Sequence, residues 1–169
     1  MIELYTDGAC AGNPGPGGWA WAVAPEGTPA GFGGERQSTN QRMEIRAALE
    51  AMRAFVGQPI TIVSDSTYVV NCINKKWYVN WQRNGWKNSA KQPVANQDLW
   101  KPMVDLYDAR LHTFRWVKGH SGNRMNDLAD QLAVAASKGP FDVEVDVDIV
   151  DGVVAVSYTH LTLPTIYSV

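Results

Sequence analysis

Four acidic side chains and one histidine stand where the sequence could assemble a reaction centre: Asp7, Glu44, Asp65, Asp130 and His120. Asp7 and Asp65 each follow a short apolar run of strand type, and the carboxyl ends of parallel strands share one edge of a sheet. Carboxylate oxygens, without cysteine or paired histidine ligands, suit a hard divalent cation such as Mg²⁺ better than zinc. The residue types therefore point to a magnesium site.

Each of these residues also has an ordinary structural interpretation. Glu44 could be a solvated helix acid, Asp65 could cap the following helix, and Asp130 could be a surface acid. His120, in a Gly-His-Ser-Gly loop, is open to either reading. The glycine-rich stretch 8–18 is either a plain hairpin connection or a turn whose N–H groups are open to a phosphate or metal.

The elements that must position these residues follow from the hydrophobic periodicity, which predicts the order βββαβααβα. Because a strand-helix-strand crossover requires a parallel pair, the fold class is α/β with a mixed sheet. Asn96 is expected to cap the third helix. Strands are expected over residues 2–6, 19–24, 31–37, 60–64 and 113–117, and helices over 41–56, 66–72, 97–109 and 126–136.

Length and composition fit one globular domain. The chain has 169 residues, of which 45% are hydrophobic and 19% charged, enough for a full core. It contains no membrane-spanning apolar run and no signal peptide. Cys10 and Cys72 lack metal-ligand spacing and are read as free thiols of a reducing compartment. We therefore expect a cytoplasmic protein that does not bind membranes.

Charge is distributed unevenly along the chain. Residues 1–139 hold all 15 basic residues and 12 of the 17 acidic ones, a surplus of three positive charges. The segment from Lys75 to Lys91 holds five basic residues and no acid. Because local charge attracts a polyanion, this segment is a candidate nucleic-acid surface.

Taken together, the motifs resemble those of bacterial type 1 ribonuclease H, in unbroken order over about residues 1–139. They are Thr-Asp-Gly at 6–8, Arg-Met-Glu at 42–44, Asp-Ser at 65–66 and Val-Lys-Gly-His-Ser-Gly at 117–122. The resemblance implies a ribonuclease H-like fold, with a five-stranded mixed sheet and helices on both faces. It also implies a sequence-nonspecific endonuclease that hydrolyses the RNA strand of RNA–DNA hybrids and leaves 5′-phosphate and 3′-hydroxyl ends.

The resemblance assigns a role to each residue of the centre. Asp7 would bridge two Mg²⁺ ions, with Mn²⁺ as a substitute, and Asp130 would help hold the ion that activates water. Glu44 and Asp65 would hold the ion beside the leaving 3′-oxygen. Such ions, about 3.5–4 Å apart, neutralise the attacking and leaving oxygens of a phosphodiester. His120 would assist proton transfer or product release.

Substrate contacts implied by the resemblance concern sugar and backbone rather than base sequence. A DNA phosphate would lie in a pocket of Thr39, Asn40 and Asn13. Contacts with the 2′-hydroxyls of RNA are expected from Gly8, Ala9 and Cys10, with Asn13, Gln41 and Ser66 nearby.

The segment of about 75–91 resembles the basic protrusion of the family. Its basic residues would follow phosphates, which makes binding salt-dependent. Its tryptophans either contact the substrate or pack the protrusion together. The residues concerned are Lys75, Lys76, Arg83, Lys87, Trp77, Trp81 and Trp86. With the protrusion present, we expect no separate hybrid-binding domain, no obligate protein partner and a monomer.

Two alternatives to a hybrid-cleaving enzyme differ in class. A non-catalytic hybrid-binding module would keep the protrusion, but loss of one of the four acids would favour it and none is lost. A DNA-cutting relative on the same fold would share clustered acids, but not the Gly-His-Ser-Gly loop together with this protrusion.

Residues after 139 fit no part of the resemblance. Residues 141–149 alternate apolar and acidic, so 140–155 is expected to be a non-catalytic acidic hairpin or an unstructured acidic tail. Residues 156–169 begin with Val-Ser-Tyr-Thr-His-Leu, which resembles a translated sequencing adapter. We expect this last segment to be non-native.

Overall fold

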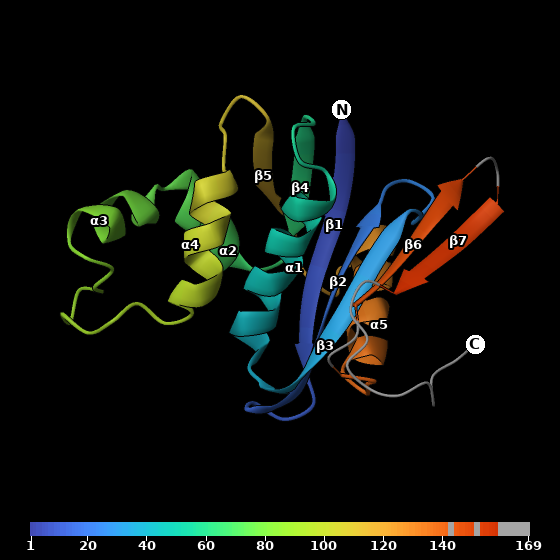
Figure 1. The fold of residues 1–169 in the computed structure, drawn as a ribbon, viewed down its shortest axis with the longest axis horizontal. Helices are drawn as coiled ribbons and strands as arrows, with labels where there is room; N and C mark the ends of the chain where they lie inside the picture. The colour runs from blue at the N-terminus through green and yellow to red at the C-terminus, as the bar shows by residue number, and fades with distance from the viewer. Residues whose placement is uncertain (142–143, 151–152, 159–169) are drawn as a thin grey trace.

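The computed structural model describes residues 1–141, 144–150 and 153–158, the last two segments by their backbone alone. Its elements run along the chain as Figure 1 shows. They are β1 (Ile2–Cys10), β2 (Gly15–Val23), β3 (Ala30–Ser38), α1 (Asn40–Ala54), β4 (Ile60–Ser64), α2 (Thr67–Asn74), α3 (Trp77–Arg83), α4 (Gln97–Leu106), β5 (His112–Trp116), α5 (Arg124–Ala136), β6 (Glu144–Val150) and β7 (Val153–Tyr158).

The strands form one mixed sheet in the order β5-β4-β1-β2-β3-β6-β7. β4 lies between β1 and β5 and is parallel to both, whereas β2 and β3 continue from β1 as an antiparallel meander. The predicted mixed sheet of five strands is confirmed as the part from β5 to β3. Beyond it, β6 pairs antiparallel with β3, and β7 with β6.

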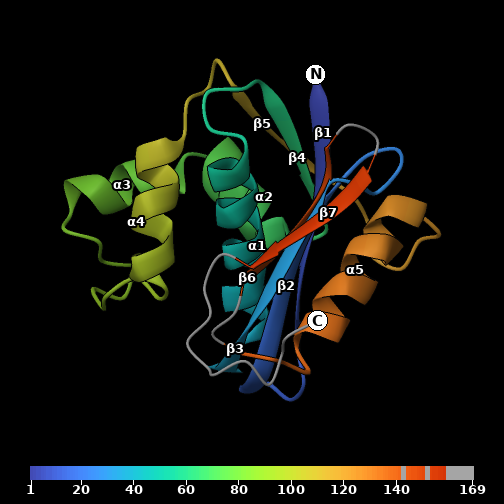
Figure 2. The ribbon, with the colours of Figure 1, turned by 45° about the vertical axis from the view of Figure 1, so that its right-hand side comes forward.

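Helices cover both faces of the sheet. Successive strand residues point to opposite faces, so Leu4 and Ile62 join a core with α1, α2 and α4. Their neighbours Tyr5 and Val63 join a second core, whose helix is α5. Figure 2 shows α1 and α5 on opposite sides of the strands.

Two glycines allow the helices to approach the sheet closely. A Cβ on Gly8 would overlap the backbone nitrogen of Glu44 in α1, and a Cβ on Gly18 would overlap the carbonyl oxygen of Ala133 in α5. Both glycines lie inside paired strands, Gly8 opposite Trp19 and Gly18 opposite Ala9. The stretch 8–18 is therefore part of a β-hairpin whose connection is residues 11–14, which agrees with the hairpin interpretation. The two strands are longer than the predicted 2–6 and 19–24.

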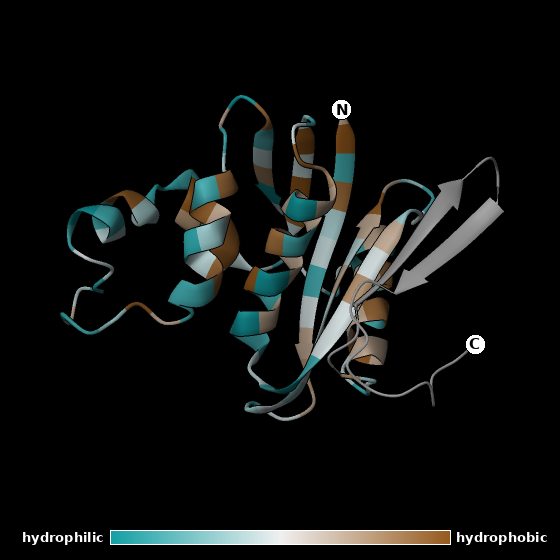
Figure 3. Cartoon of the chain, viewed as in Figure 1, coloured by the Kyte–Doolittle hydropathy of each residue, from teal (hydrophilic) through white to brown (hydrophobic). Residues whose placement is uncertain are grey.

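Three further details differ from the sequence predictions. The helix α3 was missed, and none of its seven residues, all of them described, is fully buried. Figure 3 shows that hydrophilic residues prevail around it. Asn96 stands at the N-cap of α4, but its backbone is left-handed and its side chain makes no capping hydrogen bond within the described chain. The same helix ends at Leu106 rather than 109.

The helices that the structure describes are all too short or too polar to span a lipid bilayer.

Candidate metal centre

Three carboxylates from three elements meet at one edge of the sheet. One oxygen each of Asp7, Glu44 and Asp65 lies within 4.8 Å of the other two. The parallel register pairs Thr6 of β1 with Ser64 of β4, so the residues that follow them, Asp7 and Asp65, are neighbours. Glu44 arrives from α1, whose backbone lies directly on Gly8. The structure thus brings together three of the four predicted acids.

The backbone N–H of Gly8 joins two of these carboxylates. It donates to Asp7 Oδ1 and to Glu44 Oε1, both at 2.9 Å. The sequence interpretation had left this N–H group open to an external phosphate or metal, and that was wrong for Gly8. Its hydrogen-bonding capacity instead holds Glu44 beside Asp7.

Burial makes the cluster electrostatically costly. Asp7 is only 3% exposed, and burial, together with the nearby charge of Asp65, raises its pKa to about 7. Burial and the neighbouring Asp7 raise the pKa of Glu44 as well. Buried like charges strongly disfavour ionisation, and a bound cation would favour the ionised form of both acids.

The second oxygen of Glu44 supports the same reading. Glu44 Oε2 is buried and has no hydrogen-bond partner among the described residues. A buried polar atom without a partner costs free energy, which a bound cation would remove. An all-oxygen donor set of this kind fits a hard divalent ion.

Asp130 and His120 lie at the margin of this cluster. Asp130 is half-buried on α5 and adds to the effects that raise the pKa of Asp7, after burial and Asp65. His120 is exposed, with a left-handed backbone, in the loop between β5 and α5. That loop packs against the centre at Gly119, where an added Cβ would lie 2.8 Å from Asp65 Oδ2.

Two residues that hold Asp65 were not predicted from the sequence. Asn126, 2% exposed, donates from Nδ2 to Asp65 Oδ2 at 3.3 Å. Trp116 donates from Nε1 to the backbone carbonyl of Asp65 at 3.0 Å. Asn126 precedes Asp130 by four residues, and this helical spacing was the available signal, because it places both on one helix face.

The start of α1 gathers several predicted substrate contacts. Thr39 caps the helix, with its Oγ1 accepting from the backbone N–H of Arg42 at 3.1 Å. Asn13 Oδ1 accepts from the backbone N–H of Asn40, also at 3.1 Å, and Gln41 beside it is exposed. The trio of Asn13, Thr39 and Asn40 is therefore assembled in one place.

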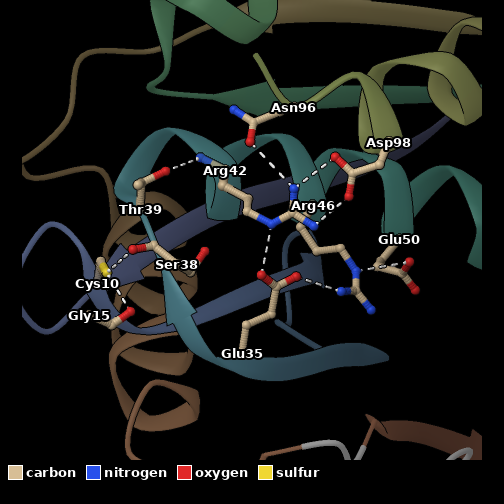
Figure 4. Close-up of polar contacts among 10 residues, drawn as sticks. All are labelled: Cys10, Gly15, Glu35, Ser38, Thr39, Arg42, Arg46, Glu50, Asn96 and Asp98. Carbon is tan, nitrogen blue, oxygen red and sulfur yellow. Dashed lines mark hydrogen bonds and ion pairs between the residues drawn. The ribbon is translucent and has the colours of Figure 1, made fainter.

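Cys10 and Ser66 already have intramolecular partners. The Cys10 thiol donates to the carbonyls of Gly15 and Ser38 (Figure 4), and burial raises its pKa. Ser66 caps α2 by accepting from the backbone N–H of Val69 at 3.2 Å.

The basic protrusion, residues 75–91, extends away from the sheet (Figure 1) and contains α3. Its basic side chains at 75, 76, 83 and 87 are exposed. Trp81 packs on Trp100 of α4 and on Trp86, with ring centroids 5.8 and 5.9 Å apart. Trp77 packs on Tyr68, 5.7 Å away. These half-buried rings therefore fasten the protrusion to the domain.

A hollow of about 680 Å³ opens on the protrusion, lined among others by Tyr68, Trp77, Trp81, Arg83 and Lys87. Exposed cations and indole edges thus share one surface. Such a surface combines the two features that bind a nucleic-acid strand.

Comparison with known proteins agrees with this geometry. The sequence profile of the family described as RNase H matches residues 1–138. The Ribonuclease H of Syntrophomonas wolfei subsp. wolfei is 52% identical over 140 residues, which are 81% of this chain and 96% of that protein. The Ribonuclease H of Pseudomonas entomophila is 46% identical over 134 residues, 78% of this chain and 90% of that protein.

A solved structure shares the fold as well. The crystal structure of LC9-RNase H1, a type 1 RNase H with the type 2 active-site motif, superposes with a TM-score of 0.72 at 29% identity. The match covers 92% of this chain and 77% of that one.

Proposed function

Because this chain belongs to the ribonuclease H family, we propose that it hydrolyses the RNA strand of RNA–DNA hybrids with the help of two metal ions, without sequence preference. The products carry 5′-phosphate and 3′-hydroxyl ends. The observation that carries the proposal is the meeting of Asp7, Glu44 and Asp65, each with an oxygen within 4.8 Å of the others. None of the acids expected of the family is replaced.

The acids would hold the metal ions. Asp7, Glu44, Asp65 and Asp130 are the proposed ligands, and Mg²⁺ is the proposed ion, with Mn²⁺ as a substitute. Two such ions supply neutralisation of the attacking and leaving oxygens and lower the pKa of the attacking water. Asn126 orients the carboxylate of Asp65, and Gly8 aligns Glu44 with Asp7.

His120 is the proposed proton carrier. Its imidazole is exposed and stands one residue from Gly119, which touches Asp65. From this loop the side chain can accept a proton at the site of cleavage or help the product leave.

The protrusion and the start of α1 are the proposed hybrid-binding surfaces. Exposed Lys and Arg of residues 75–91 would follow the phosphates of one strand, beside the rings of Trp77 and Trp81 that line the hollow. Trp86 stays a proposed contact. The pocket of Asn13, Thr39 and Asn40 receives a DNA phosphate. Ala9, Cys10, Gln41 and Ser66 stay proposed contacts of the RNA sugar, whereas the N–H of Gly8 is engaged by the carboxylates.

A panel of substrates tests the proposed function. The purified protein is incubated with labelled RNA–DNA hybrid, single-stranded RNA, duplex RNA and duplex DNA, with and without Mg²⁺. Cleavage of the RNA strand of the hybrid alone, only with metal, and products that a 3′-hydroxyl-dependent ligase or polymerase accepts, would support it. Binding without cleavage would favour a non-catalytic module, and cleavage of duplex DNA a DNA-cutting relative.

The C-terminal part has no proposed catalytic role. The matched family ends at residue 138, and the proposed domain covers 1–139. Residues 140–155 include β6 and the start of β7, which add strands to the edge beyond β3. Of the proposed adapter-derived segment 156–169, only residues up to 158 lie within the described chain. The monomeric state and the cytoplasmic location stay predictions.

A further inference from the structure

Arg42 joins three elements through one guanidinium group (Figure 4). Its NH1 and NH2 pair with both carboxylate oxygens of Asp98 in α4, at 2.9 and 2.7 Å. Its Nε pairs with Glu35 Oε1 of β3 at 2.8 Å. NH1 also donates to Asn96 Oδ1 at 3.4 Å. A two-pronged pairing of this kind fixes orientation as well as distance.

The pairing continues along α1. The second oxygen of Glu35 accepts from Arg46 at 2.9 Å, Arg46 pairs with Glu50, and Glu50 with Arg53. The side chains of Arg42 and Glu35 are 24% and 19% exposed. The Arg42–Glu35 pair is therefore shielded from solvent more than ordinary surface ion pairs, which contribute little. Asp98 is 62% exposed, and its link to Arg42 rests on the two-pronged geometry. The network ties the first turn of α1 to both β3 and α4.

On the α1 side, Arg42 stands next to the metal centre. It precedes Glu44 by two residues, and Met43 between them is fully buried. Met43 is held tightly, since a Cβ on Gly17 would lie 2.7 Å from its Cγ. A shift of this turn would therefore displace Glu44 from Asp7.

On the α4 side, Arg42 holds the point where the chain returns from the protrusion. Residues 84–96 lead from α3 to α4. Asn96 ends this return with a left-handed backbone, φ 63°, and its side-chain oxygen faces Arg42 instead of capping α4. Asp98 follows in the first turn of the helix. Arg42 thus lies on the helix that carries Glu44, and its guanidinium binds Asn96 and Asp98, where the chain that returns from the protrusion enters α4.

We propose that Arg42 is a positioning residue that keeps the basic protrusion at a fixed distance and orientation relative to the carboxylate cluster. A hybrid gripped by the protrusion then presents its RNA phosphate at Asp7, Glu44 and Asp65. This inference rests on the proposed function, because it requires a hybrid that engages both surfaces. Misplacement of the reacting groups by about 1 Å can cost on the order of 100-fold in rate, so this relative position matters for turnover.

The test compares hybrids of different length. Long hybrids span the protrusion and the metal centre, and the short hybrid is one that the wild-type protein cleaves at a rate unaffected by neutralising Lys75, Lys76 and Lys87, so that its cleavage does not depend on the protrusion. We expect Arg42→Ala to lower kcat on the long hybrid about tenfold or more, with KM changed less, and to leave cleavage of the short hybrid within about twofold. A merely structural weakening would lower both alike.

Matched variants separate this role from loss of charge or of helix stability. Arg53→Ala removes an arginine at the far end of the same network, 48% exposed and paired with Glu50, and should leave both substrates unaffected. Asp98→Asn should reproduce the effect of Arg42→Ala, and the double variant should be no worse than either. Arg42→Lys keeps the charge without the fork and should fall between.

The outcomes are distinguishable. Equal loss of kcat on long and short hybrids, or no loss on either, would overturn the positioning role. So would additive effects of Arg42→Ala and Asp98→Asn. Should Arg42→Ala fail to fold by circular dichroism, Arg42→Lys and Asp98→Asn carry the same comparison. Failure of the wild-type protein to cleave any hybrid would instead refute the proposed function.

Discussion

At the scale of single residues, the molecule concentrates negative charge where a core would normally exclude it. Asp7 is buried between strands, beside Glu44 and Asp65. The fold holds the three acids together because Asp7 lies within β1, Asp65 directly follows β4, and Glu44 lies near the start of α1. That placement is also why the acids could be predicted from the sequence.

Replacing Asp7 should stabilise the metal-free protein. Its pKa rises from 3.8 to about 7 on folding, so the folded protein binds a proton that the unfolded chain has released. Stability of the wild type therefore falls as pH rises through this window. Asp7→Asn should raise the free energy of unfolding by on the order of 4 kcal/mol at pH 8 in EDTA, and by much less near pH 4, as measured by urea denaturation. Asp127→Asn, on the half-exposed part of α5, is the control. An equal gain for Asp7→Asn at both pH values would contradict the electrostatic explanation.

Mg²⁺ should offset the loss of stability that the ionised Asp7 causes in the wild type. Because protons and metal compete for the same carboxylates, added Mg²⁺ should raise the wild-type melting temperature more at pH 8 than at pH 6. Asp7→Asn should lose most of this metal-dependent gain. A gain of the same size in Asp7→Asn would show that the ion binds elsewhere.

Asn126 should act through Asp65. Asn126→Ala removes the hydrogen bond to Asp65 Oδ2, and loss of such a supporting contact typically costs about 10–100-fold in metal affinity or activity. We expect the Mg²⁺ concentration for half-maximal activity to rise. Ser137→Ala is the control, because it removes a hydrogen bond from Ser137 Oγ to the Val134 carbonyl at the other end of α5 and should leave the Mg²⁺ dependence unchanged. A shift of the same size in both variants would mean that Asn126 acts only on the helix.

At the scale of elements, the sheet and most helices could be predicted, because their apolar spacing is local information. The role of the glycines could not. A turn glycine and a glycine that admits a neighbouring helix look alike in sequence, and only the approach of α1 to Gly8 distinguishes them. The prediction that the Asn96 side chain caps α4 failed for a related reason, because that side chain accepts a hydrogen bond from Arg42 instead. The helix α3 has no fully buried face to produce a periodic signal.

The protrusion should bind phosphates rather than catalyse. Neutralising Lys75, Lys76 and Lys87 together should raise KM severalfold and reduce its salt dependence. Each phosphate contact that is lost lowers the number of counterions released when the hybrid binds. Steady-state kinetics over a range of salt concentrations measure both. Lys138→Gln, at an exposed position after α5, is the control. An unchanged salt slope in the triple variant would mean that the hybrid binds another surface.

At the scale of the whole molecule, the part that matches the family ends at residue 138, before the end of the chain. All the proposed ligands, the protrusion and the Arg42 network lie within residues 1–138, the part that matches the family. The strands β6 and β7 only extend the sheet beyond β3. The alternation of apolar and acidic residues could not decide whether 140–155 forms a hairpin or an unstructured tail. A period of two residues indicates a strand, but it does not show whether a sheet edge is available for pairing.

A chain that ends at Phe141 should therefore keep its activity. Phe141 is retained because its ring packs against Arg36, 5.5 Å from the guanidinium carbon. We expect kcat/KM on a long hybrid within about twofold of the full chain, since no proposed contact with substrate or metal is removed. A large loss with an unchanged melting temperature would assign the C-terminal part a role in binding.

The cluster of Asp7, Glu44 and Asp65 is proposed to cut the RNA strand of a bound hybrid. The decisive variant is Asp65→Asn, with hybrid binding and single-turnover cleavage measured on the same preparation in Mg²⁺. We expect hybrid affinity within a few-fold of wild type and a cleavage rate lower by at least about 1000-fold, because one proposed metal ligand loses its charge. Cleavage retained within tenfold of the wild-type rate would contradict this proposal.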